Sequence, residues 1–400
     1  MATRSVGVIE QNPARAGFFR WRVSTALLAI GLAAAPGHAA TLRVGADAPL
    51  PTLAEAVRQA RDGDTILVQA GEYRGDVALI HHKRLTIRGV GQRPVFIADG
   101  RDVEGKAMLV VRDGDVEIDN LEFRGARVPD GNGAGIRFEK GRLTLRRCAF
   151  FDNQMGVLTA NFGDAELVIE DSEFAQAPQA ESPLPHLLYA GRIASLKVSG
   201  SRFHQGHVGH LLKSRARRTE LAYNLIVDGP GGRASYEVDL PNGGDALLIG
   251  NVIGRSAASD NAVVVAYGAE GKAWPHSRLR LVHNTLINEG PHPARFVRVW
   301  SDRLPAHTPL QAVNNLSVGR GDFTRGAAWV SAGNFSAPGS VLVAADALDF
   351  ALVRASSLRG AGVDAAAFGS ELALRHEFAL PLGTRPLSPP ARWSPGAVQR

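Results

Sequence analysis

The chain has 400 residues, of which 45% are hydrophobic and 21% charged, so it can bury a sizeable core and is not wholly disordered. Its single cysteine, Cys148, excludes intramolecular disulfides and any cysteine-based metal cage. The formal net charge of +6 would by itself suggest a polyanionic partner such as a nucleic acid, so the positions of the charges have to be considered.

Residues 1–39 have the pattern of an export signal. Arg15, Arg20 and Arg22 precede a short apolar run at 23–35, and small residues follow where a signal peptidase would cleave. This run is too short to span a bilayer comfortably, and no other stretch approaches twenty apolar residues. We therefore expect a periplasmic or secreted protein with no transmembrane segment after signal removal.

Removal of the signal also changes the charge balance. Residues 1–39 contain four arginines and one glutamate, so 41 basic and 38 acidic residues remain, a balance of +3. Much of the basicity thus belongs to the export signal, and no nucleic-acid partner is expected. The exported chain is expected to be a monomer.

A strand-like segment at 41–45 is followed by a short predicted helix, which begins at a capping box formed by Thr52 and Glu55. Beyond it, runs of β-branched and aromatic residues alternate with Gly, Asn and Asp. A small polar residue, followed two positions later by an apolar one in most copies, recurs at intervals of 23 to 33 residues. These positions are Asn120, Cys148, Ser172, Ser201, Asn224, Asn251, Asn284 and Asn315, the first and last being looser matches.

Such a period of strands and turns predicts a solenoid, in which each asparagine can bond to the equivalent asparagine of the next coil. An antiparallel sandwich is disfavoured, because it would have tight two-residue turns at shorter spacing.

The chain resembles the right-handed parallel β-helix proteins of the pectin-lyase-like superfamily. The resemblance rests on residues 52–73, which look like that family's capping helix and first coil, and on residues 348–364, similar to its closing coil. It implies an all-β, right-handed parallel β-helix at 40–364 with an N-terminal capping helix. Residues 365–400 lack the repeat and carry five prolines, so they form either a tail or cap packed on the solenoid or a disordered tail.

Strand alternation predicts which side chains of the central coils face outward. Alignment of residues 186–191, 210–215 and 236–241 allows Leu188, Leu212 and Val238 to lie inside. The opposite choice would bury Lys213, Glu237 and Asp239. The predicted outward set is Leu187, Tyr189, Leu211, Lys213, Arg215, Glu237 and Asp239.

Stacked strands lie about 4.8 Å apart, which predicts that Tyr189, Lys213 and Asp239 form a line. The groups expected around this line are Arg215 and Glu237 on its flanks, His186 and His210 at the strand starts, and Arg217 and Arg218 continuing the basic stripe. No other part of the sequence concentrates so many chemically capable groups.

The cluster suits an acidic polysaccharide, because β-elimination of a uronate needs its carboxylate neutralised and a base to remove the adjacent proton. By resemblance to lyases of the superfamily, Lys213 or Arg215 would be the base or substrate clamp, with Tyr189 or His210 as proton donor. The same resemblance makes calcium a candidate cofactor, with Glu237 and Asp239 as its ligands. His186, Arg217 and Arg218 are the expected substrate-binding residues.

Three alternatives stay open, because the superfamily also contains hydrolases, epimerases, esterases and non-catalytic proteins. Lys213 and Asp239 could form a merely structural ion pair on a solvated sheet. A glycoside hydrolase is disfavoured because the nearby cations would keep both Glu237 and Asp239 ionised. A non-catalytic carbohydrate-binding or surface-matrix protein would use aromatic platforms such as Tyr189 and Trp274.

Overall fold

The computed structural model describes residues 39–179, 184–324 and 329–400, and Ala39–Arg400 form one compact unit. The predicted export signal lies outside the described residues apart from Ala39. Within the described ranges, no helix has both the length and the apolar character needed to cross a membrane.

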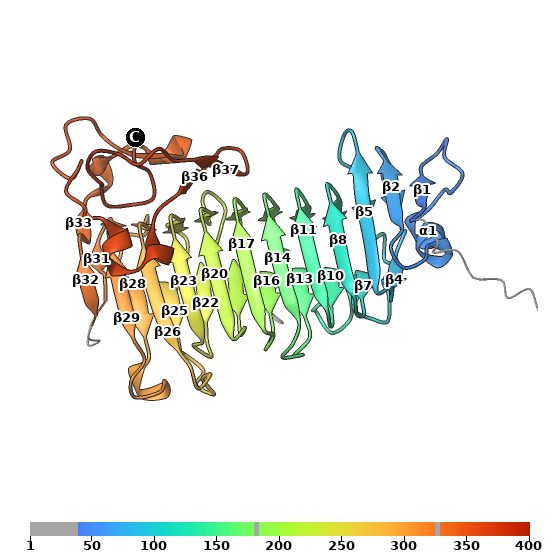
Figure 1. Cartoon of the computed structure of the whole chain (residues 1–400), viewed down its shortest axis with the longest axis horizontal. Helices are drawn as coiled ribbons and strands as arrows, with labels where there is room; N and C mark the ends of the chain where they lie inside the picture. The colour runs from blue at the N-terminus through green and yellow to red at the C-terminus, as the bar shows by residue number, and fades with distance from the viewer. Residues whose placement is uncertain (1–38, 180–183, 325–328) are drawn as a thin grey trace, which may run out of the picture. The chain divides into compact units, whose positions relative to one another are not determined.

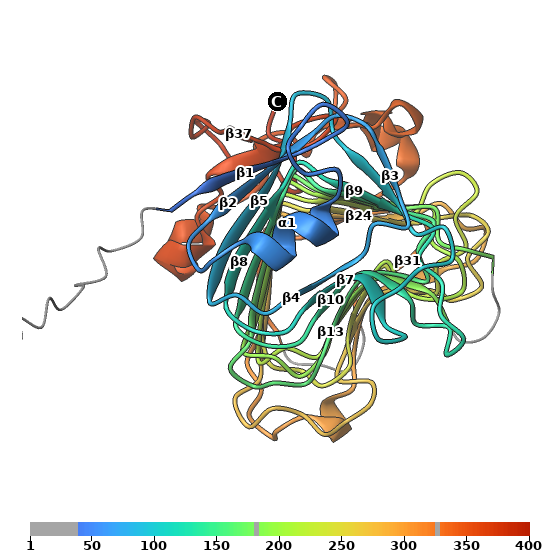
Figure 2. The same ribbon diagram turned by 90° about the vertical axis from the view of Figure 1, so that its right-hand side faces the viewer.

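The described residues form a solenoid whose coils stack in chain order, so that three parallel sheets run along it (Figures 1 and 2). Sheet A consists of β1 (Thr41–Val44), β2 (Thr65–Gln69), β5 (Arg84–Val90), β8 (Asp115–Asp119), β11 (Arg142–Arg146), β14 (Glu166–Glu170), β17 (Ser195–Ser199), β20 (Arg218–Ala222), β23 (Asp245–Ile249), β26 (Arg278–Val282), β29 (Leu310–Val313) and β32 (Val330–Ala332).

Sheet B consists of β3 (Glu72–Arg74), β6 (Val95–Ile97), β9 (Glu122–Arg124), β12 (Ala149–Phe151), β15 (Glu173–Ala175), β18 (Arg202–His204), β21 (Leu225–Val227), β24 (Val252–Arg255), β27 (Thr285–Asn288), β30 (Leu316–Val318) and β33 (Phe335–Ala337). Sheet C consists of β4 (Ala78–Ile80), β7 (Ala107–Val111), β10 (Ala134–Phe138), β13 (Met155–Thr159), β16 (His186–Ala190), β19 (Leu212–Ser214), β22 (Val238–Leu240), β25 (Val263–Tyr267), β28 (Ala294–Val299) and β31 (Gly321–Asp322). The three sheets enclose the main hydrophobic core.

The predicted N-terminal helix is α1 (Leu53–Gln59), which lies across the first coils (Figure 2). The hydroxyl of Thr52 accepts a hydrogen bond from the backbone N–H of Glu55 at 3.2 Å, as the capping pattern predicts. Leu53, Ala56 and Val57 are buried, so the helix covers the apolar end of the solenoid.

The asparagine ladder is also confirmed. In each step of the ladder, the side-chain Nδ2 of one asparagine donates a hydrogen bond to the side-chain Oδ1 of the next, at 2.9 Å. The steps run from Asn224 to Asn251, from Asn251 to Asn284 and from Asn284 to Asn315. All four residues are buried, so each bond satisfies polar groups inside the turn between sheets A and B. Asn120, one of the looser matches, lies outside the ladder, because its amide bonds to the carbonyl of Gly89 instead.

Residues 365–400 pack on the last coils. Leu372 and Leu374 are buried in one cluster with Ile249 and Val282, and the backbone N–H of Ala397 donates to Thr285 Oγ1 at 3.0 Å. The short elements here and just before are η2 (Gly339–Val341), β34 (Leu342–Ala344), η3 (Ala345–Ala347), β35 (Asp349–Leu352), η4 (Ala365–Phe368), η5 (Ser370–Leu372), β36 (His376–Phe378) and β37 (Thr384–Pro386) (Figure 1). A further short helix, η1 (Ser301–Arg303), lies between β28 and β29.

Candidate functional site

Sheet C brings the predicted line of side chains into register. Tyr189 on β16 pairs with Lys213 on β19, which in turn pairs with Asp239 on β22. Leu188, Leu212 and Val238 are buried at the preceding positions. Parallel register therefore places a phenol, an amine and a carboxylate on three consecutive coils, as the sequence predicts.

The amine of Lys213 lies between two carboxylates. Its Nζ is 3.4 Å from Asp239 Oδ2 and 2.8 Å from Glu270 Oε1. Lys213 is only 8% exposed and Asp239 only 2%, so this is not the solvated surface pair that one alternative expected. An ion pair removed from water is screened less than an exposed one and keeps a fixed geometry.

Arg215 is held by three partners on the same face. Its Nε donates to the hydroxyl of Tyr189 at 2.7 Å and its Nη1 to Asn242 Oδ1 at 3.0 Å. Its Nη2 lies 2.5 Å from Glu270 Oε2. Burial lowers the pKa of Arg215, but Tyr189 and Glu270 outweigh this effect and raise the pKa above its usual value. Arg215 therefore keeps its charge, which suits binding of an anion better than removal of a proton.

Glu270 was missed by the sequence analysis. It lies in the loop 268–277 between β25 and β26, 57 residues from Lys213 along the chain. Burial tends to raise its pKa, but hydrogen bonds and charges from Lys213 and Arg215 lower it below the usual range, so the carboxylate stays ionised. Its position in an irregular loop left no periodic signal in the sequence.

His186 and His210 stack on each other beside the line, with ring centroids 4.7 Å apart. Their Nδ1 atoms accept backbone N–H groups, of His210 at 2.9 Å and of Tyr236 at 3.3 Å. Burial lowers the pKa of His186 to about 3 and that of His210 well below its usual range. Both rings are therefore neutral and carry their proton on Nε2.

His210 Nε2 lies 3.4 Å from Asp239 Oδ2, so the histidine can donate to that carboxylate. Burial raises the pKa of Asp239 to about 6, against the opposing effect of Lys213. The other oxygen, Oδ1, is buried without a hydrogen-bond partner. His186 and His210 are only 7% and 8% exposed, so they offer little surface to a bound molecule.

The predicted outward orientation of Glu237 is wrong. Its side chain is completely buried, and neither carboxylate oxygen has a hydrogen-bond partner. The prediction assumed strict alternation along the strand, but the adjacent Leu187 and Leu188 both belong to the core, and so does Leu211. Glu237 occupies the position equivalent to Leu187 and Leu211, and therefore faces inward.

The predicted calcium ligands consequently do not assemble. Glu237 faces the core, whereas Asp239 faces Lys213 and His210 outside it. In the parts of the chain that the structure describes, no three His, Cys, Asp or Glu side chains form a group suited to a metal ion. The remaining carboxylates, Asp239 and Glu270, are already neutralised by the Lys213 ammonium and the Arg215 guanidinium. This donor set does not fit calcium.

Arg217 and Arg218 do not extend the stripe on sheet C. Both side chains are exposed, and they line a separate depression of about 380 Å³ together with Lys197 and Glu166 of sheet A. The chain turns from sheet C to sheet A between Arg215 and Arg218, which directs the two pairs of basic residues to different sheets.

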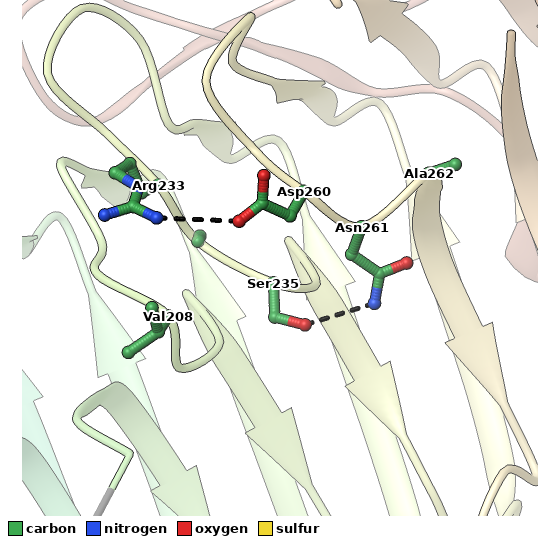
Figure 3. Close-up of a pocket in the computed structure, with 7 residues that line it drawn as sticks. Val208, Arg233, Ser235, Asp260, Asn261 and Ala262 are labelled. Atoms are coloured by element: carbon green, nitrogen blue, oxygen red, sulfur yellow. Dashed lines mark hydrogen bonds and ion pairs between the residues drawn. The ribbon is translucent and has the colours of Figure 1, made fainter. Parts of the chain in front are cut away.

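A second hollow, of about 400 Å³, lies at the turns that lead into β22 and β25 (Figure 3). It is lined by Arg233 and Asp260, which lie 3.5 Å apart, and by Ser235 and Asn261, whose amide donates to the Ser235 hydroxyl at 3.1 Å. Its polar groups thus mostly satisfy one another, and Lys213 and Arg215 are not among the residues that line it.

Comparison with solved structures identifies the fold. Pectate lyase Pel9A superposes with a TM-score of 0.59 and 13% sequence identity, over 91% of this chain and 97% of that one. The chain therefore has a right-handed parallel β-helix fold. Weaker matches to this parallel β-helix are an alginate lyase from Paenibacillus sp. str. FPU-7 (TM-score 0.41, 15% identity, 74% of this chain and 95% of that one) and Geobacillus virus E2 ORF18 (TM-score 0.39, 12% identity, 69% and 53%). No protein-family model and no curated protein matches the parallel β-helix chain in sequence.

Proposed function

We propose that this protein, after export to the periplasm or beyond, binds an acidic polysaccharide at the cluster around Lys213 and Arg215 and cleaves it by β-elimination. One observation carries the proposal: these two cations together hold a carboxylate, that of Glu270, at 2.8 and 2.5 Å. A uronate carboxylate presents the same two oxygens to the same two donors.

The reaction removes the proton on the carbon next to the uronate carboxylate, forms a carbon–carbon double bond and breaks the bond to the glycosidic oxygen. Arg215, which stays charged, neutralises the carboxylate as negative charge develops. Lys213 removes the proton after its own ammonium group has lost one to solvent, and the hydroxyl of Tyr189 donates a proton to the leaving oxygen. Asp239 positions the Lys213 amine, and His210 in turn contacts Asp239.

The test is a panel of uronate polymers, assayed for an unsaturated product that absorbs in the ultraviolet. Lys213→Ala should abolish the absorbance, whereas Lys197→Ala should leave it unchanged, because Lys197 lies on sheet A in a different depression. Polymer binding without any product would support a non-catalytic binding protein instead. New reducing ends without ultraviolet absorbance would support a hydrolase.

A further inference from the structure

The backbone of the loop 268–277 is fixed to the coil beneath it. Its attachments are hydrogen bonds from Glu270 N to Pro241 O at 3.0 Å, from Trp274 N to Asn242 O at 3.1 Å and from Trp274 Nε1 to Arg215 O at 3.0 Å. The guanidinium of Arg192 also covers the Trp274 ring at 4.0 Å from its centroid. These contacts hold the loop backbone in place beside the cluster, and the Glu270 side chain extends from the loop to the two cations.

Glu270 is the replaceable partner of the two cations. Without it, Lys213 would still contact Asp239, and Arg215 would still bond to Tyr189 and Asn242. Asp239 has 3% of its side chain exposed, whereas Glu270 has 42%. A partly exposed carboxylate exchanges its ion pairs for water or for another anion more readily than a buried one.

We propose that Glu270 occupies the carboxylate subsite in the free protein and that an acidic sugar chain binds by displacing it. The identity of the incoming anion rests on the proposed function, whereas the displacement itself rests on the geometry of Glu270. Because the loop backbone is anchored on both sides of the residue, the displacement is a rotation of the Glu270 side chain rather than an opening of the loop. Glu270 therefore sets the affinity for the substrate and selects anionic over neutral sugars, since a neutral sugar cannot replace its charge.

The test compares wild-type protein with Glu270→Gln in calorimetric titrations with oligogalacturonate, with oligomeric alginate and with a neutral oligosaccharide of equal length. Loss of the internal competitor should tighten binding of the preferred acidic oligomer about three- to fivefold, the equivalent of one partly exposed ion pair. The affinity for the neutral oligomer should not change.

Glu117→Gln is the matched control. Glu117 also lies between two cations, Arg146 at 2.7 Å and Arg88 at 3.9 Å, and its side chain is 33% exposed, but it belongs to sheet A. The Glu117→Gln substitution removes the same charge from the protein but changes no residue of the cluster. Its affinities for the acidic and neutral oligomers should therefore equal those of the wild type. Thermal unfolding of both variants shows whether either has lost its fold.

The outcomes separate the two proposals. If wild-type protein binds an acidic oligomer and Glu270→Gln binds it no tighter than Glu117→Gln, the displacement is wrong and the proposed function stands. If Glu270→Gln is folded and binds more weakly, Glu270 contacts the substrate instead of competing with it, and the displacement is again wrong. If neither folded protein binds any acidic oligomer of the panel, the proposed function itself fails, and the displacement fails with it.

Discussion

Glu237 and Asp239 are two residues apart, yet their carboxylates lie on opposite sides of sheet C. Asp239 faces outward, with its Oδ2 3.4 Å from Lys213 Nζ. Glu237 is completely buried, and neither of its carboxylate oxygens has a hydrogen-bond partner. The backbone bends at Glu237, and β22 begins only at Val238. One carboxylate therefore belongs to the candidate site and the other to the core.

Replacement of Glu237 by leucine should stabilise the protein. The equivalent residues of the preceding coils are Leu187 and Leu211, both in the core, so a leucine of similar size fits the same column. Removal of an unbonded buried polar group should raise the free energy of unfolding by about 1–3 kcal/mol near neutral pH. Urea unfolding of Glu237→Leu measures this, and an unchanged or lower stability would contradict the inward orientation.

The same variant has a defined pH dependence. Burial, with a contribution from Asp228, raises the pKa of Glu237 well above its usual range in the folded state. The folded protein thus binds more protons than the unfolded chain, and the contribution of Glu237 to stability falls as the pH rises above the unfolded value of about 4.3. The advantage of Glu237→Leu should therefore grow as the pH increases, and an advantage that is largest below pH 4 would argue against a buried carboxyl.

The fold was predictable because it follows from repetition. Each coil is too thin to bury a core alone, so the asparagine positions and the short apolar runs had to recur at the coil length, as Asn224, Asn251 and Asn284 do. The register of Tyr189, Lys213 and Asp239 was predictable for the same reason, since parallel pairing keeps equivalent positions in line.

The remainder of the site does not follow from repetition. Glu270 reaches Lys213 from a loop of irregular length, and no period relates the two residues. The orientation of Glu237 depends on a local bend that breaks the two-residue alternation on which the prediction relied. The direction of Arg217 and Arg218 depends on where the chain turns from one sheet to the next. These three features depend on the course of the turns and loops, which the repeat does not determine.

Arg215 should be more sensitive to conservative replacement than an ordinary surface arginine. Three of its nitrogens bond to three different partners, Tyr189, Asn242 and Glu270, and one ammonium group cannot reproduce that fork. On the best substrate of the proposed lyase reaction, Arg215→Lys should lower kcat/KM about 100-fold. The matched control is Arg218→Lys on sheet A, and equal effects of the two replacements would contradict the assigned role of Arg215.

Chelation should leave the proposed lyase activity unchanged. The two carboxylates near the cluster already contact Lys213 and Arg215, and Glu237 points into the core, so the residues predicted to bind calcium do not converge. Activity on the best polymer should be measured after dialysis against EDTA and again with added calcium. Loss of activity with EDTA that calcium restores would show that a cation binds here in spite of this donor set.

The pH dependence of activity should report on Asp239. Its pKa is raised to about 6 by burial, and it pairs with Lys213 only when ionised, so activity should fall as the pH decreases through about 6. The contribution of Asp239 to stability changes in the opposite sense: its folded pKa lies above the unfolded value of about 3.9, so this contribution is largest at low pH and declines as the pH rises towards 6. His186 is not responsible for such a transition, because its pKa is lowered to about 3. Asp239→Asn should remove the step near pH 6 and lower kcat above that pH, where the ionised Asp239 is the buried counter-ion of Lys213. A pH profile of Asp239→Asn with the wild-type step intact would assign that step to another group.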